Sequence, residues 1–232
     1  MKGNNTEISQ RILYEDNHLV IVNKLPSEIV QGDKTGDVPL SEVVKDYIRV
    51  KYNKPGEAFL GVVHRLDRPV SGAVIFARTS KALARMNAIL HDRKIEKKYW
   101  AIVKDSPPRN EDTLINYLKK NEEKNKSFVS NSDLNGALRC ELRYILIGKS
   151  DKYSLLEVEL MTGRHHQIRA QLSHIGCPIK GDLKYGYPRS NPDASISLHS
   201  RSIKFLHPVS QVEVYVLAPP PDEALWNFFS NQ

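Results

Sequence analysis

The sequence is poor in cysteine, and its two cysteines, Cys140 and Cys177, are far apart. Two cysteines cannot form the disulfide framework that stabilises small secreted domains, and no Cys-x-x-Cys pair is present for zinc or redox chemistry. The chain also has no apolar run of about 18 residues, so we expect no membrane-spanning helix. Its polar N-terminus lacks the apolar core of a signal peptide. Together these absences predict a cytoplasmic protein.

Motifs for bound nucleotides, metal ions and serine nucleophiles are also missing. Neither GxxxxGK[ST] nor GxGxxG occurs, so no nucleotide cofactor is expected. His165, His166 and His174 do not have the spacing and the neighbouring glutamate of an HExxH zinc motif. Ser71-Gly72 is only a fragment of the GxSxG motif of serine hydrolases. We therefore predict a protein that works without a metal ion or a cofactor.

Basic residues are in excess, with 34 Lys and Arg against 27 Asp and Glu in 232 residues, which gives a net charge of +7. Such an excess is a feature of proteins that bind nucleic acid, although many basic proteins bind none. The hydrophobic fraction of 40% and the charged fraction of 26% are ordinary for a globular protein and exclude wholesale disorder. Charge alone leaves nucleic-acid binding as one hypothesis among several.

The hydrophobic pattern predicts more strands than helices, with several strands joined as hairpins. The expected strands and hairpins are Arg11–Lys24, Ala58–Val63, Ala73–Ala77, Lys98–Val103, Leu138–Ile147, Ser154–Leu160 and Ser197–Ala218, with Lys119–Lys126 as a solvated hairpin tip. Ser41 and Ser80 are the expected N-caps of two helices, and a third helix contains Ile168, Leu172 and Ile175. This pattern favours an α+β fold with a mixed, mostly antiparallel sheet over a regular βαβ series.

One polar loop, His64–Gly72 (HRLDRPVSG), separates two apolar strands. Asp67 lies there between Arg65 and Arg68, and neighbouring positive charge favours the ionised form of a carboxylate. An ionised aspartate suits a nucleophile or a base and suits a general acid poorly. The alternative is a surface turn with local ion pairs, each worth about 0–1 kcal/mol. The residues of the loop do not decide between these two interpretations.

A second basic cluster, Thr162–Arg169 (TGRHHQIR), opens the third predicted helix. Free backbone N–H groups and Arg164 would form a phosphate-binding site there. The alternative is an ordinary basic first turn, although arginine opposes the positive end of the helix dipole unless an anion binds. Further along, we interpret Asp182 as a turn residue before Leu183 rather than as a second catalytic carboxylate.

Four segments, in the same order, resemble motifs of the RluA-type RNA pseudouridine synthases. They are Ile12–Lys24, His64–Gly72, Lys97–Val103 and Thr162–Gly186, and the resemblance extends roughly from Arg11 to Pro219. The departures are Val70 for the usual threonine, Lys24-Leu25-Pro26-Ser27 for KPxG, and His165 where a small residue is common. None of the departures affects the residues to which the resemblance gives a catalytic role.

The resemblance implies roles for individual residues. Asp67 aligns with the nucleophilic aspartate, Tyr99 with the tyrosine that stacks on the target uracil, and Arg169 with the arginine that pairs with the catalytic carboxylate. Arg65 matches a residue that fills the gap left by the flipped base. We expect the contacts to RNA to come from Lys24, His64, Arg65, Arg68, Arg164, His166 and Gln167.

The resemblance also implies the reaction, in which the bond from ribose to N1 of uracil breaks and a bond to C5 forms without a cofactor. The partner would be ribosomal RNA, transfer RNA or both, and we expect a monomer. Residues 1–10 would be a flexible tail and residues 11–232 a single catalytic domain, without the small N-terminal RNA-binding domain that many relatives carry. The loops Gln31–Pro39 and Asn121–Asn135 are the expected specificity elements.

Two other functions stay open at this point. One is a non-catalytic RNA-binding protein that retains the fold. The other is a glycosidase that acts on small molecules, which would not need the net charge of +7. Steep loss of RNA affinity with salt would argue against the glycosidase.

Overall fold

The computed structural model describes residues 7–130, 132–133 and 136–231. The chain divides into two units, each built from two segments: unit 1 contains Met1–Glu96 and Ser200–Pro220, and unit 2 contains Lys97–His199 and Pro221–Gln232. The single catalytic domain over residues 11–232 stays a prediction. Most of the expected flexible tail, residues 1–6, lies outside the described residues, whereas residues 7–10 are helical and Ile8 is fully buried.

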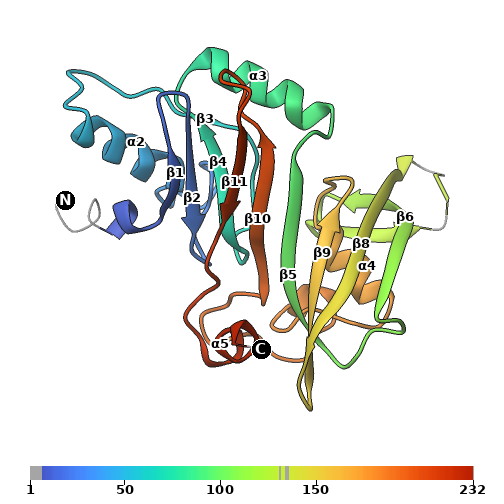
Figure 1. Cartoon of the computed structure of the whole chain (residues 1–232). Helices are drawn as coiled ribbons and strands as arrows, with labels where there is room; N and C mark the ends of the chain where they lie inside the picture. The colour runs from blue at the N-terminus through green and yellow to red at the C-terminus, as the bar shows by residue number, and fades with distance from the viewer. Residues whose placement is uncertain (1–6, 131, 134–135, 232) are drawn as a thin grey trace. The chain divides into compact units, whose positions relative to one another are not determined.

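Unit 1 is a strand array covered by helices (Figure 1). Its strands follow the order β1 (Ile12–Glu15), β2 (Leu19–Lys24), β4 (Ser71–Ala77), β10 (Leu198–Leu206) and β11 (Glu213–Leu217), and the short β3 (Gly61–Val62) also pairs with β4. Its helices are α2 (Leu40–Lys51) and α3 (Ser80–His91). Ala82 and Met86 of α3 pack on buried residues of β2, β4, β10 and β11, which form the hydrophobic core of the unit.

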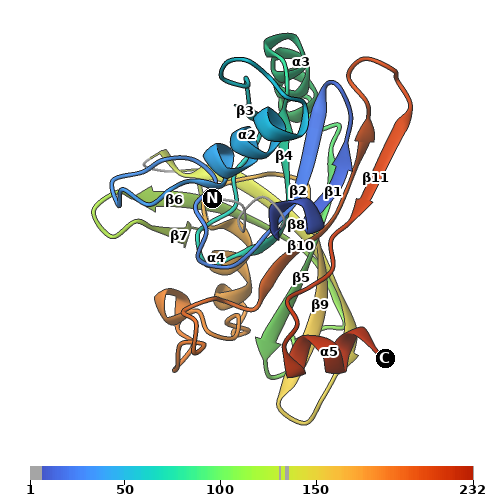
Figure 2. The same ribbon diagram turned by 90° about the vertical axis from the view of Figure 1, so that its left-hand side faces the viewer.

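Unit 2 is an antiparallel sheet with helices packed on it (Figure 2). Its strands follow the order β5 (Glu96–Lys104), β9 (Tyr153–Leu160), β8 (Leu138–Lys149), β6 (Glu111–Asn121) and β7 (Lys126–Ser130). Helix α4 (Gln167–His174) packs through Ala170 on Leu118 and Cys140, beside the short 3-10 helix η2 (Leu183–Tyr185). Helix α5 (Ala224–Ser230) packs Trp226 and Phe229 on Ile102 and Leu155.

The predicted fold class is confirmed, because the structure is α+β with mostly antiparallel pairing. Asp16 shows why the first hairpin forms: its Oδ1 accepts the backbone N–H groups of His18 and Leu19 at 2.7 Å each, which closes the turn between β1 and β2. The predicted hairpins of Lys119–Lys126 and Ser197–Ala218 are also present.

The ends and caps of several predicted elements differ from those in the structure. Helix α2 begins one residue before the expected cap Ser41, with Pro39 at its N-cap position, because Ser41 is buried inside the first turn. Thr79, rather than Ser80, caps α3 by accepting the Ala82 N–H at 3.1 Å. The strand expected over Ala58–Val63 is only the two-residue β3. The one-residue shifts at the two helix ends are ordinary.

In the part of the chain that the structure describes, none of the helices is long and apolar enough to cross a membrane. No group of three or more His, Cys, Asp or Glu side chains with the geometry of a metal site occurs among the same residues.

Candidate active site

The loop that carries Asp67 lies in unit 1 between β3 and β4. Asp67 is partly exposed, and the loop closes on itself where the Val70 N–H donates to the Asp67 carbonyl at 3.0 Å. Leu66 and Val70 are buried on either side of it. The Nε2 atom of His64 accepts the backbone N–H of Ile75 in β4 at 3.2 Å. These contacts fix the backbone around a carboxylate that solvent can still reach.

The end of the loop needs a glycine. Gly72 has a φ of 114°, and a Cβ atom added there would overlap the backbone of Ser200 in β10. No other residue fits that close approach without moving the strand. The conformation explains why the loop ends on a glycine, and it gives Gly72 a structural role.

Lys24 anchors the same loop from the end of β2. Its ammonium donates to the carbonyls of Leu25 at 2.9 Å, Arg68 at 3.1 Å and Val70 at 2.6 Å, and its side chain is fully buried. The expected RNA contact of Lys24 stays a prediction that its burial does not support, because its ammonium donates to the loop backbone and none of its surface is exposed. Lys24 fixes the loop that holds Asp67.

Burial also changes the acidity of this lysine. Loss of water around the ammonium lowers the pKa of Lys24 to about 8, and the negative charges of Glu28 and Asp67 act in the opposite direction. At neutral pH the ammonium form still predominates. A positive charge therefore stands beneath the loop that carries Asp67.

Arg68 and Arg65, which flank Asp67 in the sequence, have different environments. Arg68 forms an ion pair with Asp37, and its Nε donates to the Ser27 carbonyl at 3.2 Å. The hydrogen bond with Arg68 lowers the pKa of Asp37. Arg68 thus shares its charge with Asp37 and connects the loop Gln31–Pro39 to the loop of Asp67, and its expected contact with RNA stays a prediction. Arg65 is exposed, as an RNA contact requires.

Tyr99 and Arg169 belong to unit 2. Tyr99 lies on β5 opposite Val158 of β9, and only 6% of it is exposed. Arg169 lies in the first turn of α4 and is 5% exposed. Both side chains are held by regular secondary structure, so their directions are set by strand register and helix phase.

The guanidinium of Arg169 makes a bidentate hydrogen-bonded contact with a carboxylate. Its Nε donates to Oδ2 of Asp182 at 2.7 Å, and its Nη2 donates to Oδ1 of Asp182 at 2.9 Å. Asp182 is 1% exposed. Asp182 does lie in a turn before Leu183, as predicted, and its side chain is in addition a buried partner of a predicted catalytic residue.

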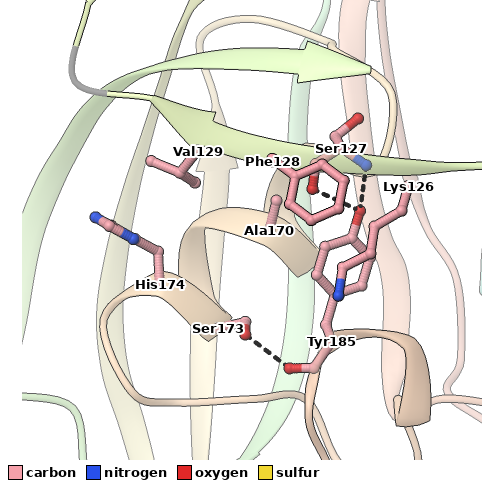
Figure 3. Close-up of a pocket in the computed structure, with 8 residues that line it drawn as sticks. All are labelled: Lys126, Ser127, Phe128, Val129, Ala170, Ser173, His174 and Tyr185. Carbon is pink, nitrogen blue, oxygen red and sulfur yellow. Dashed lines mark hydrogen bonds between the residues drawn. The ribbon is translucent and has the colours of Figure 1, made fainter. Parts of the chain in front are cut away.

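The ring of Tyr185 packs against the face of the same guanidinium, whose central carbon lies 5.0 Å from the centre of the Tyr185 ring. The Tyr185 hydroxyl accepts the backbone N–H of Ser127 in β7 at 2.8 Å, and Ser173 donates to the Tyr185 carbonyl at 2.7 Å (Figure 3). Beside Tyr185 is an open pocket of about 240 Å³. The pocket is lined by Lys126, Ser127, Phe128, Val129, Ala170, Ser173, His174 and Tyr185.

His166 belongs to this buried network and not to the surface. Its Nδ1 lies 3.0 Å from the Tyr185 hydroxyl, and only 8% of the residue is exposed. Burial, with help from the positive charge of Arg169, lowers the pKa of His166 to about 2, so the imidazole stays neutral. The expectation that His166 contacts RNA is not supported by this burial.

Gln167 is buried too, and it organises the start of α4. Its Oε1 accepts hydrogen bonds from the Thr162 hydroxyl at 2.8 Å and from the Arg164 N–H at 3.0 Å, and its Nε2 donates to the Glu141 carbonyl at 3.0 Å. Gln167 and part of the predicted phosphate-binding site are therefore engaged in contacts within the protein, in place of the predicted contacts with RNA. Arg164 is half-buried and donates from Nε to the Arg139 carbonyl at 3.3 Å.

Comparison with known proteins gives consistent results. A family model described as RNA pseudouridylate synthase matches residues 18–174. The ribosomal large subunit pseudouridine synthase C of Buchnera aphidicola subsp. Acyrthosiphon pisum is 35% identical over 226 residues, which is 94% of this chain and 69% of that protein. The ribosomal large subunit pseudouridine synthase D of Xylella fastidiosa is 30% identical over 230 residues, or 94% of this chain and 68% of that protein. This chain thus spans about two-thirds of the length of such relatives.

Solved structures support the fold. Human RNA Pseudouridylate Synthase Domain Containing 4 superposes with a TM-score of 0.79 at 22% identity, covering 99% of this chain and 94% of that chain. Human RNA Pseudouridylate Synthase Domain Containing 1 gives a TM-score of 0.73 at 21% identity, covering 94% and 86%. With the family match over residues 18–174, these findings show that the chain belongs to the RNA pseudouridylate synthase family, a family of isomerases.

Proposed function

We propose that the protein converts uridine to pseudouridine in RNA, with Asp67 as the catalytic carboxylate. The observation that supports this most directly is the loop of Asp67 itself. It has the sequence HRLDRPVSG, its backbone is anchored by Lys24, and its carboxylate is partly exposed. A non-catalytic relative would have no need to keep a partly exposed aspartate on a fixed loop. The family membership of the chain adds to this argument.

The reaction is an isomerisation and balances without an added reactant. The bond from C1′ of ribose to N1 of uracil breaks, the base turns, and a bond from C1′ to C5 forms. C5 loses its proton, and N1 gains one. Asp67 acts either on the sugar carbon or by removing a sugar proton, and both paths require its ionised form. Glycosidases that add water use two carboxylates. The proposed reaction adds no water and assigns the reacting role to Asp67 alone.

Before this reaction, the target uridine must be flipped out of the base stack of the RNA. Flipping a base out of a stack costs a few kcal/mol, which contacts with the phosphate backbone offset. The net charge of +7 supplies such contacts. Arg65 is exposed and is our proposed occupant of the space that the flipped base leaves. Tyr99 is the proposed stacking partner of the uracil ring, and Arg169 the proposed cation for the catalytic carboxylate.

We propose ribosomal RNA of the large subunit as the target. The support comes from two relatives whose names specify the ribosomal large subunit. The loop Gln31–Pro39 is a proposed specificity element, and Asp37 within it pairs with Arg68 next to Asp67. This pair links the loop Gln31–Pro39 to the side chain of a residue next to Asp67.

Mapping of pseudouridine in total RNA tests the proposal. Cells that lack the gene should lose pseudouridine at one or more positions of large-subunit ribosomal RNA. The wild-type gene should restore the modification, and an Asp67→Asn variant that accumulates to the same level should not. Loss of pseudouridine from transfer RNA only would replace the proposed target and keep the activity. An unchanged map would reject the activity in favour of a non-catalytic RNA-binding role.

A further inference from the structure

The carboxylate of Asp182 is a buried charge whose placement the proposed chemistry does not explain. Asp182 and Arg169 have side chains that are 1% and 6% exposed. Removing two charges from water costs several kcal/mol per ion, and their attraction repays this only when the geometry is good. A buried ion pair is therefore weak evidence for stability. A better reason for keeping such a pair is that it fixes the direction of a group.

The geometry of the pair is suited to fixing a direction. The Nε and Nη2 donors of Arg169 engage both oxygens of Asp182 at 2.7 and 2.9 Å, so the planar group cannot turn about its long axis. A guanidinium has five N–H donors, and this contact uses the edge that carries Nε. By the planarity of the group, its Nη1 end faces away from Asp182. The carboxylate thus determines where the remaining donors of Arg169 point.

Asp182 is itself fixed by its backbone. Its carbonyl accepts the N–H groups of Tyr185 at 3.1 Å and Tyr187 at 3.0 Å, and its own N–H donates to the Ile179 carbonyl at 3.0 Å. The ring of Tyr185 then covers the guanidinium of Arg169. The tight turn after α4 therefore presents a carboxylate and an aromatic ring to one arginine at the same time.

We propose that Asp182 is a positioning residue that sets the direction of the Arg169 guanidinium for the isomerisation. The inference rests on the proposed function, in which Arg169 serves the catalytic carboxylate. Asp182 acts through Arg169 and does not touch the substrate. A purely structural pair would give the same contacts, so the test must separate positioning from stability.

Unit 1 offers a matched control. Glu15 and Arg78 also form a buried ion pair, with side chains that are 8% and 6% exposed and a distance of 3.4 Å, and neither has a role in the proposed reaction. Asp182→Asn and Glu15→Gln each replace a buried carboxylate by the amide of the same shape. We expect Asp182→Asn to lower kcat about 10²-fold, as a misplaced catalytic group does, with KM for RNA within about threefold of wild type. Glu15→Gln should keep kcat per folded molecule within about threefold.

The pH profile of kcat gives a readout that stability does not move. Among the described residues, the titratable groups near the guanidinium include the carboxylate of Asp182, the neutral imidazole of His166 and the phenol of Tyr185. If Arg169 leaves its position in Asp182→Asn, the catalytic carboxylate loses a cation and the acid limb of the profile moves to higher pH. If Arg169 stays, removal of the negative charge moves the limb to lower pH or leaves it in place, and either result would overturn the proposal.

Further variants separate failure of this inference from failure of the proposed function. Retained activity in Arg169→Ala would reject the role of Arg169, and an inactive wild-type protein would reject the proposed function. Lost activity in Arg169→Ala together with a wild-type kcat in Asp182→Asn would reject only the inference. If Asp182→Asn fails to fold, Asp182→Glu keeps the charge and should retain kcat within about tenfold. If neither variant folds, the pair is a structural requirement and the proposal is wrong.

Discussion

Each unit of the protein buries one cation next to a segment that the family resemblance marks as functional, and the two cations are held in different ways. Lys24 in unit 1 donates to three backbone carbonyls, which are neutral. Arg169 in unit 2 donates to both oxygens of a carboxylate. The ammonium of Lys24 thus donates to neutral acceptors and is attracted by the charges of Glu28 and Asp67, whereas the guanidinium of Arg169 is hydrogen-bonded directly to the charge of Asp182.

The difference separates two tasks. Carbonyl partners fix a lysine where the purpose is to hold a loop together, because an ammonium is a point charge that binds several acceptors in any direction. A carboxylate fixes an arginine where the purpose is direction, because the two planar groups match edge to edge. In unit 1 the buried Lys24 therefore holds a loop together, and in unit 2 a turn fixes the direction of the buried Arg169.

Replacing the buried lysine should give the largest effect on stability. Lys24→Met would leave the carbonyls of Leu25, Arg68 and Val70 buried without a donor, at a cost of about 3 kcal/mol. For a chain of this length the thermal midpoint should fall by about 6–12 °C. Lys94→Met is the control, because Lys94 is 70% exposed and pairs only at the surface with Asp92. Equal midpoints for the two variants in a thermal unfolding experiment would show that Lys24 does not anchor the loop.

Replacing the buried arginine should affect catalysis more than stability. In Arg169→Lys an ammonium still meets the Asp182 carboxylate, so the midpoint should fall by no more than about 4 °C, or about 1 kcal/mol. The bidentate contact is lost, and kcat should fall about 10²-fold because the lysine ammonium is no longer held in one direction. Single-turnover assays with saturating enzyme measure this. Full activity in Arg169→Lys would mean that charge, and not direction, matters in unit 2.

The neutral histidine beside Arg169 predicts a dependence of stability on pH. The pKa of His166 is about 2 in the folded protein, against about 6.5 for an unperturbed histidine, so between these values only the unfolded chain takes up the proton. This group should therefore lower the free energy of unfolding by about 1.4 kcal/mol for each pH unit below 6.5. His166→Gln removes the titration and should flatten the acid side of the stability profile. Parallel profiles in urea unfolding would contradict the low pKa.

The smallest expected effect concerns the exposed ion pair between the two loops of unit 1. Asp37 is 51% exposed and Arg68 44% exposed, so their pair is worth about 0–1 kcal/mol and is weakened by salt. Asp37→Asn should leave kcat unchanged and alter KM for RNA by less than about threefold at 50 mM salt. A tenfold or larger change would make the loop Gln31–Pro39 a principal determinant of RNA binding.

Much of the fold could be predicted because alternating apolar residues and turn residues are local signals. The hairpin closed by Asp16 and the segment that contains Tyr99 follow from them. Asp67 could be found because its loop has a distinctive sequence. The roles of Asp67, Tyr99 and Arg169 stay predictions, since the structure places these residues and does not test their chemistry.

The partners of the buried cations could not be predicted. Asp182 is 13 residues beyond Arg169, and only the turn after α4 brings the two together. Lys24 ends a strand, where a lysine normally faces water, and tertiary packing alone buries it. Likewise, His166 and Gln167 have polar side chains typical of a surface, but they bind Tyr185 and Glu141 inside the protein. Sequence patterns report which residues are polar and do not report which polar groups meet.

The central claim is that Asp67 converts uridine to pseudouridine in RNA, and release of tritium from RNA containing 5-tritiated uridine tests it most directly. The proton at C5 must leave when ribose joins that carbon, so each turnover releases one tritium. We predict that wild-type protein releases tritium from large-subunit ribosomal RNA and that folded Asp67→Asn releases none while it binds the same RNA with unchanged affinity. Release by Asp67→Asn near the wild-type rate would contradict the account.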